Sequence, residues 1–570
     1  MRETPLRARS RAWYPFPVQT GEAHGRAAWR HVAQALALGL AGVLLGSAVI
    51  ASRQSAAEGY WAVGYYRLLA DALWQRFDGA LPVAIPVALA AGALVAALRR
   101  GRKGPRLGPA LALLALVGGL RGASALDAWL ASRGPNLVII SIDTLRADRL
   151  GAYGYALPTS PTLDRLAAEG VLVEDVYSQS PKTTPSHMTL LTSLYPCVHG
   201  VELWWHDEPA HVLSPAVHTL AEVLKNAGYA TVAFTGGGQV DRSRGFDQGF
   251  DRYSHGQELE KTLRWLDAHR RGKFFLFFHT YLVHDPYVHP LRWVHLFDAH
   301  YRGAVLDTVE RLLTEEDGRG GPEAYSQDRH RRFWASVQQD DPADIEFVAR
   351  LYDAGIRRMD ETVLAPLLGR LDALGLARDT LVVFTSDHGE AFAEHGHFGH
   401  DDLHAETLRV PLVLRFPGQL VAGRRVAGRA RLLDVMPTVL DLLGVPAPPV
   451  VQGRSLVPWL MGHPDPAGAD EAVSEYDHRW AGRVYESVRR GRLSYIVEDA
   501  HEHLFDLSDD PGEANDLLDT RPTDAAALRA ALASWLEECR GLAGRFGPGD
   551  AIVRPSAERA RQLRALGYVE

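Results

Sequence analysis

Three long apolar stretches occupy most of the first 132 residues. Val32–Ala51 and Gly79–Leu98 each run for twenty residues, and a third stretch begins at Leu107 and stays uncharged to Leu120. Twenty helical residues span about 30 Å, the thickness of the hydrocarbon core of a bilayer. The pattern therefore predicts a membrane anchor at 32–132 with about three transmembrane helices. The third helix spans only if it continues through Arg121.

After residue 132 the pattern changes to alternating strands and helices. Continuous runs of β-branched and aromatic residues are typical of strands that are buried on both faces of a parallel sheet. Such runs lie at 136–142, 231–234, 274–279, 381–385 and 411–415. Helical spacing of apolar residues occurs at 160–169, 216–227, 345–374 and 432–443. This alternation predicts an α/β fold, with a mixed, mainly parallel sheet between helices and its chemistry at the carboxyl ends of strands.

Two further segments are less regular. Residues 291–344 are polar, charged and glycine-containing, which predicts an insertion or a substrate-side lid. The C-terminal stretch predicts one or two helices, at 525–542 and 556–566.

Charge divides the chain at the same place as hydropathy. Residues 1–132 carry fifteen Lys and Arg against six acids, a net charge of +9. Because the whole chain has a net charge of −8, the remaining residues carry −17. An acidic body argues against nucleic-acid binding. The cations gather in the N-terminal tail and in the 98–107 loop, and positively charged loops stay in the cytoplasm. The body after residue 132 is therefore expected outside the cytoplasm, facing the periplasm or cell exterior. Ala-rich soluble helices or a cleavable signal peptide explain three Arg-flanked runs less well.

Candidate chemistry lies where predicted strands end. Asp143 ends the first strand, and Asp387 and His388 end a later one in the sequence SDHGE. A single carboxylate after a strand is more often a turn former, but adjacent carboxylate and imidazole donors suit a divalent cation. Thr183 precedes an amphipathic helix that starts near Ser186, so it lies where a helix N-terminus stabilises anions. The alternative role for Thr183 is a plain helix cap.

Seven histidines fall in two short stretches beside these strand ends. They are His279, His284 and His289 after one buried strand, and His395, His397, His400 and His404 after Asp387. A single histidine is more often structural or solvated, but clusters at strand ends suggest anion binding or proton transfer.

These stretches together resemble the sulfatase family. TTPSHMTLLTSLYP is similar to the signature C/S-x-P-S-R-x-x-L-L-T-G-x-Y-P, with matches at Pro185, Ser186, Leu190, Leu191, Thr192, Tyr195 and Pro196. SIDTLRADRLGAYG resembles the first motif D-D-x-R-x-D, DHGE the second metal motif, and HDPY with the preceding His279 the H-x-x-D-P-H-x-P-Y element. Further matches are Asp434, Pro437, Thr438, Asp441, Gly453 and the closing segment HLFDLSDDPGEANDL.

The resemblance covers about 135–518 and implies an alkaline-phosphatase-like fold with a small C-terminal subdomain. Together with the hydropathy and charge patterns, it gives five expected segments: a cytoplasmic tail at 1–31, the membrane anchor at 32–132, a sulfatase-like catalytic domain at 133–465, a C-terminal subdomain at 466–520 and a helical tail at 521–570.

The chain departs from the family pattern at three positions of these motifs. Thr183 stands where sulfatases need a Cys or Ser that is oxidised to formylglycine, and a Thr cannot give that aldehyde. Neither Cys197 nor Cys539 lies at that position. His187 replaces the signature Arg and Thr144 the second Asp. This pattern is similar to the Thr-nucleophile branch of the superfamily, which includes membrane-anchored phosphoethanolamine and phosphoglycerol transferases.

The resemblance implies specific roles for the candidate residues. Asp143, Asp387, His388 and the Thr183 hydroxyl are expected to hold one divalent metal ion, with Zn or Mn preferred over Ca or Mg because imidazole suits softer ions. Thr183 is then the expected nucleophile, and no formylglycine is expected. The remaining expected roles are catalysis by His284 and His400, with His187 and Lys182 as further candidates, and substrate binding by His279, His284 and His400.

Three functions remain open from the sequence. The first is a metal-dependent hydrolase of sulfate or phosphate esters, acting on an anionic substrate that is free or linked to a lipid or glycan. The second is a transferase that moves a lipid headgroup to a glycan or another lipid. The third is a non-catalytic pseudoenzyme, which the survival of a hydroxyl and three metal-type ligands disfavours.

Overall fold

The computed structural model describes residues 134–547, apart from 202–211, 257–258, 317–326, 464–469 and 479–482. The predicted tail, the predicted membrane anchor and the predicted helix at 556–566 lie outside the described residues. Within those ranges, no helix is both long enough and apolar enough to span a membrane.

An eight-stranded sheet forms the centre of the described chain, in the order β10-β2-β9-β6-β1-β5-β3-β4. Its strands are β1 (Asn136–Ile142), β2 (Val171–Tyr177), β3 (Ala230–Thr235), β4 (Arg252–His255), β5 (Phe274–Thr280), β6 (Thr380–Ser386), β9 (Leu412–Arg415) and β10 (Arg424–Arg431). Strand β9 is antiparallel to both neighbours, and the other pairings are parallel. The predicted mixed, mainly parallel α/β sheet is confirmed.

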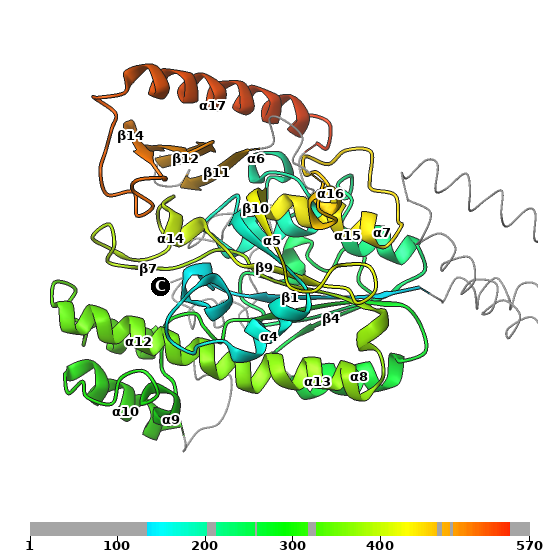
Figure 1. The fold of residues 1–570 in the computed structure, drawn as a ribbon, viewed down its shortest axis with the longest axis horizontal. Coiled ribbons are helices and arrows are strands. Elements are labelled where there is room, and N and C mark those ends of the chain that lie inside the picture. Colours follow the sequence, from blue (N-terminus) through cyan, green and yellow to red (C-terminus); the bar gives the residue numbers. More distant parts are fainter. Residues whose placement is uncertain are drawn as a thin grey trace, which may run out of the picture. The chain divides into compact units, whose positions relative to one another are not determined.

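Helices cover both faces of this sheet (Figure 1). One layer contains α5 (Thr183–Thr192), α7 (Leu220–Asn226), α15 (Val435–Leu442) and α16 (Val457–Leu460). The other contains α4 (Pro161–Glu169), α8 (Leu259–His269), α12 (Pro342–Met359) and α13 (Ala365–Ala373). Successive side chains of a strand point to opposite faces, so Leu137 and Ile139 enter one core and Val138 and Ile140 the other. The predicted helix 345–374 is α12 and α13, joined by a π-helical turn at Asp360–Leu364.

The small C-terminal subdomain is a four-stranded antiparallel sheet. Its strands, in sheet order, are β11 (Glu471–His478), β12 (Arg483–Arg490), β13 (Leu493–Glu498) and β14 (His501–Asp506). Helix α17 (Pro522–Ala543) packs against β12 and β13.

Helices occupy much of the described part of segment 291–344, predicted from its polarity to be an insertion or lid. They are α9 (Leu291–Val294), α10 (Ala304–Glu316) and α11 (Gln327–Trp334). Val309 and Leu312 of α10 and Phe333 of α11 are fully buried. These apolar side chains fix the described parts of the segment on the domain.

Candidate active site

Strand register brings the two predicted metal-binding carboxylates together. Strand β1 lies between β5 and β6, and Ile142 pairs with Thr280 on one side and Ser386 on the other. Because the three strands are parallel and end at the same edge, Asp143 and Asp387 follow them side by side. Both residues are completely buried. Ligand atoms of Asp143, Asp387 and His388 all lie within 4.8 Å of one another.

The electrostatics of this pair favour a cation. Asp143 Oδ1 and Asp387 Oδ2 receive no hydrogen bond from the described residues. Burial raises the pKa of Asp143 to about 7. Burial and the charge of Asp143 raise the pKa of Asp387 to about 8. Two buried carboxylates with open lone pairs beside an imidazole fit a divalent metal ion.

Thr183 lies at the first position of α5, next to these ligands. The predicted helix started near Ser186, but α5 begins at Thr183, and the residue before it, Lys182, has extended backbone. Thr183 Oγ1 lies 3.3 Å from His388 Nε2. The four residues expected to hold a metal therefore converge, with the Thr183 hydroxyl at the N-terminus of a ten-residue helix.

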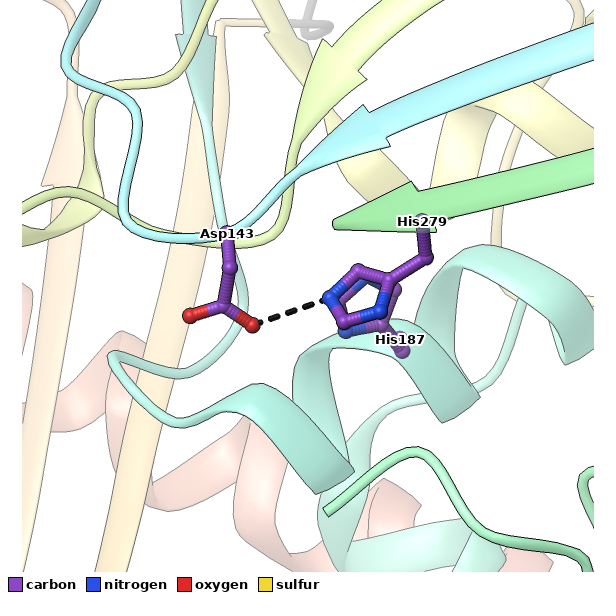
Figure 2. A group of neighbouring side chains, drawn as sticks. All are labelled: Asp143, His187 and His279. Carbon is purple, nitrogen blue, oxygen red and sulfur yellow. Dashed lines mark hydrogen bonds and ion pairs between the residues drawn. The ribbon is translucent and has the colours of Figure 1, made fainter. Parts of the chain in front are cut away.

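His279 is hydrogen-bonded to Asp143, as the dashed line in Figure 2 shows. The Gly236 amide donates to His279 Nδ1 at 3.3 Å, so the ring proton is on Nε2. Nε2 then donates to Asp143 Oδ2 at 3.1 Å. Burial lowers the pKa of His279 to about 3, which keeps the ring neutral. Expected from the sequence to bind substrate, His279 has both nitrogens bonded to protein groups and is completely buried.

His187 occupies a similar place behind Thr183 and Asp387. Its Nδ1 lies 2.9 Å from the Thr183 carbonyl oxygen and 3.3 Å from Asp387 Oδ2, so Nδ1 carries the proton. Nε2 accepts from the Ser141 hydroxyl at 2.9 Å. Burial lowers the pKa of His187 to about 4. These contacts suit a neutral ring that orients its neighbours.

His284 differs from His279 and His187 in its charge. Its Nδ1 is 2.9 Å from Asp285 Oδ1, and the ring is almost fully buried. Burial opposes the charged form, but hydrogen bonding and charge from Asp285, together with the charge of Asp143, raise the pKa of His284 to about 10. His284 is therefore an imidazolium at neutral pH.

His400 is the neutral counterpart of His284. Its ring centroid is 4.4 Å from that of His388 and 5.9 Å from that of His284. Burial and the nearby charges of Lys182 and His284 hold the pKa of His400 well below its usual value. Its Nδ1 lies 2.9 Å from the Pro181 carbonyl oxygen and 3.2 Å from Lys182 Nζ.

Lys182 lies beside His400. Its ammonium makes an ion pair with Asp401 and lies 4.6 Å from the ring centroid of Tyr476, on β11 of the C-terminal subdomain. Tyr476 also donates to Asp401 at 3.2 Å. The lysine is buried, so these partners fix the charge beside the nucleophile position.

The other predicted histidines lie outside this group. His289 is buried against Gly355 and Arg358. His395 is within hydrogen-bonding distance of Glu406 Oε1 at 2.6 Å and of the Glu513 carbonyl oxygen at 3.2 Å. Hydrogen bonding to Glu406 raises the pKa of His395 to about 9, which favours the charged ring.

Sequence patterns missed several residues of the site. Asp285 and Asp401 each adjoin a predicted histidine, so adjacency to His284 and His400 was an available signal. Glu390, the last residue of SDHGE, is buried, and burial and the charge of Asp285 raise its pKa to about 8. Tyr476 gave no signal, because it belongs to another sheet.

Comparison with known proteins shows the family of the chain. Residues 135–445 match the family model "Sulfatase", and residues 393–541 match "N-sulphoglucosamine sulphohydrolase, C-terminal". An N-acetylglucosamine-6-O-sulfatase of Bacteroides thetaiotaomicron is 23% identical over 470 residues, covering 67% of this chain and 82% of that protein. The steryl-sulfatase of Mus musculus is 30% identical over 452 residues, covering 63% of this chain and 69% of its own.

Solved structures share the fold. One, in complex with its substrate D-glucosamine-2-N,6-O-disulfate, has a TM-score of 0.57 at 21% identity and covers 73% of this chain and all of its own. The phosphonate monoester hydrolase of Agrobacterium radiobacter has a TM-score of 0.54 at 22% identity and covers 74% of this chain.

Proposed function

The chain belongs to the sulfatase family and is a hydrolase of that family, and we propose that it cleaves sulfate or phosphate esters with Thr183 as nucleophile. One observation carries the proposal: the Thr183 hydroxyl lies 3.3 Å from His388 Nε2, beside two buried carboxylates with raised pKa values. A threonine excludes formylglycine chemistry at this position. The similarity to both sulfatases and a phosphonate monoester hydrolase supports either ester class.

Asp143, Asp387, His388 and Thr183 would hold one divalent ion, with Zn or Mn preferred. When bound, such an ion would lower the pKa of the Thr183 hydroxyl and stabilise negative charge on the transferred group. His279 orients Asp143 through its hydrogen bond to Oδ2, and His187, hydrogen-bonded to the Thr183 carbonyl, lies 3.3 Å from Asp387 Oδ2.

The two site histidines are suited to opposite proton transfers. Thr183 Oγ, whose hydroxyl proton passes to solvent water, attacks sulfur or phosphorus in line, and the ester bond to the leaving oxygen breaks. His284, charged at neutral pH, gives the leaving oxygen its proton. His400 is neutral, and donation from Nδ1 to the Pro181 carbonyl leaves its Nε2 as acceptor for a proton from the water that releases the group. Lys182 adds a fixed positive charge for the anion.

A second function, transfer of a lipid headgroup to a glycan or lipid, is favoured by one observation. Thr183 is the nucleophile type of the phosphoethanolamine and phosphoglycerol transferases, and three apolar runs precede the domain. In both versions we place the site outside the cytoplasm, because the cation-rich N-terminal tail and 98–107 loop are expected on the cytoplasmic side of the membrane.

The test compares two adjacent threonines in the metal-loaded, full-length protein. Thr183→Ala should reduce turnover of aryl sulfate, phosphate monoester and phosphate diester substrates by about a thousandfold or more. Thr184→Ala is the matched control, because the Thr184 hydroxyl bonds only to Gln239 in the described structure. A rapidly quenched reaction should leave the sulfo or phospho group on Thr183.

Each outcome decides between the candidate functions. Unchanged turnover in Thr183→Ala would refute the nucleophile, and no turnover of any ester with Zn or Mn would favour the pseudoenzyme. Labelled headgroup appearing on an added acceptor alcohol would select the transferase.

A further inference from the structure

Asp285 joins the site to a helix of the insertion. Its Oδ1 lies 2.9 Å from His284 Nδ1, which is also 2.8 Å from the Asp285 backbone carbonyl oxygen. Its Oδ2 accepts from His330 Nε2 and from Trp334 Nε1, each at 2.8 Å. His330 and Trp334 are one turn apart on α11, so both donors face the same oxygen. Every hydrogen bond from α11 to Asp285 thus bears indirectly on the His284 ring.

Helix α11 is held firmly enough to act as a support. Phe333 is fully buried, and its ring lies 5.9 Å from that of Tyr287, two residues after Asp285. The Trp334 ring centroid lies 5.1 Å from that of Phe398, in the short strand β8 (Phe398–Gly399) that precedes His400. Helix α11 therefore contacts both loops that carry the site histidines.

We propose that α11 completes the active site, with His330 and Trp334 as positioning residues that fix Asp285 and, through it, His284. The proposal rests on the proposed function, in which His284 protonates the leaving oxygen. Because Nδ1 of His284 is bonded to Asp285, the ring must act through Nε2, and its direction depends on where Asp285 is held. Helix α11 of segment 291–344 then contributes to catalysis by orienting His284 and does not contact the substrate itself.

The expected signature is a dependence on the leaving group. An ester whose leaving group is a good one, such as 4-nitrophenolate, needs little proton donation, whereas an alkyl ester needs a well-placed acid. In the metal-loaded, full-length protein, His330→Ala and Trp334→Phe should lower kcat for the alkyl ester about ten- to hundredfold, and for the 4-nitrophenyl ester by less than about threefold. Trp334→Phe keeps the aromatic packing and removes only the donor.

Two variants control for a merely structural effect. His330→Gln keeps an N–H donor near the same place and should restore most of the alkyl-ester activity. Arg331→Ala changes an exposed neighbour on the same helix and should leave both substrates unaffected. Equal losses on the two esters, or no loss on either, would overturn the proposal.

Failure of the proposed function is distinguishable from failure of this inference. If the wild type turns over no ester, the function is wrong, and crystal structures of the wild type and His330→Ala then decide the positioning role. A His284 ring that keeps its contact with Asp285 in the variant would refute positioning, and a displaced ring would support it. If Thr183→Ala stays active, the nucleophile is wrong, but the leaving-group comparison still tests α11.

Discussion

Two fully buried charge clusters in the described chain are built in opposite ways. Beside the C-terminal sheet, Arg489 pairs with Glu513 at 2.9 Å, and neither side chain is exposed. Arg489 also donates to the Leu403 carbonyl, and Glu513 accepts from the Ala405 amide. At the end of the large sheet, Asp143 and Asp387 are equally buried, but the histidines within ion-pair distance of them, His279 and His187, are kept neutral by burial. Burial still raises the pKa of Asp143, although the charge of His284 acts to lower it.

The difference shows that burial of charge alone does not mark a functional site. A buried pair of opposite charges is neutral as a unit and stabilises the surrounding fold once its hydrogen bonds are made. Two like charges without a compensating cation destabilise the fold unless they bind protons or a metal ion. The first arrangement is structural, and the second is poised to bind.

The largest expected effect is on the pH dependence of the free energy of unfolding, which should change sign when a metal ion binds. In the metal-free protein the pKa values of Asp143 and Asp387, about 7 and about 8, lie above the unfolded value of about 3.9. The folded state therefore binds protons more tightly, and the free energy of unfolding should fall as pH rises from about 4 to about 8. The slope approaches about 1.4 kcal/mol per pH unit for each carboxyl.

Saturating Zn or Mn should reverse this slope, because the ion binds the ionised carboxylates. Denaturant unfolding at several pH values, after chelation and after metal addition, measures both slopes. Parallel profiles in the two states would mean that these carboxylates are not the metal site.

The structural cluster should be broken by removing one charge. Arg489→Met leaves Glu513 buried without its cation, and we expect a loss of about 3–5 kcal/mol in the free energy of unfolding. Arg490→Met is the matched control, because its ion pair with Glu471 is half-exposed and should contribute about 0–1 kcal/mol. Equal small losses in the two variants would erase the contrast between buried and exposed pairs.

The sequence predicted the functional cluster better than the structural one, for a physical reason. Asp143, Asp387 and His388 directly follow continuous apolar runs, and parallel strands that are buried on both faces must end at one edge. Arg489 lies on β12 of a small antiparallel sheet, where no comparable run exists. Strand β10, at the edge of the large sheet, was missed because half of its eight residues are charged arginines.

The residues that orient the site side chains could not be predicted from the sequence, because their partners lie far away along the chain. His330 sits in a polar, charged stretch and contacts Asp285, which is 45 residues away. His187 and His279 were recognised as candidates, but the direction of their nitrogens depends on Ser141, Gly236 and other backbone and side-chain groups. Residue type and spacing carry no information on such hydrogen bonds.

The smallest expected effect is that of an Asp→Asn substitution on the free energy of unfolding. Its sign should differ between a buried carboxylate that faces another carboxylate and one that is paired with an arginine. Asp143→Asn keeps the hydrogen bond from His279 to its oxygen and directs an amide N–H toward Asp387, as a protonated Asp143 would. Above pH 7 the variant avoids burying a second negative charge. We expect the metal-free variant to be about 1–2 kcal/mol more stable than the metal-free wild type at pH 8.

Asp434→Asn is the control with opposite expectation. Asp434 is also completely buried, but it accepts from the Arg431 guanidinium at 2.8 Å, so losing its charge leaves the Arg431 cation without its carboxylate and should destabilise the protein. Added Zn or Mn should raise the unfolding temperature of Asp434→Asn but not of Asp143→Asn. If Asp143→Asn destabilised the metal-free protein as Asp434→Asn does, the two carboxylates at the sheet edge would be structural after all, because their charges would then be compensated within the protein itself.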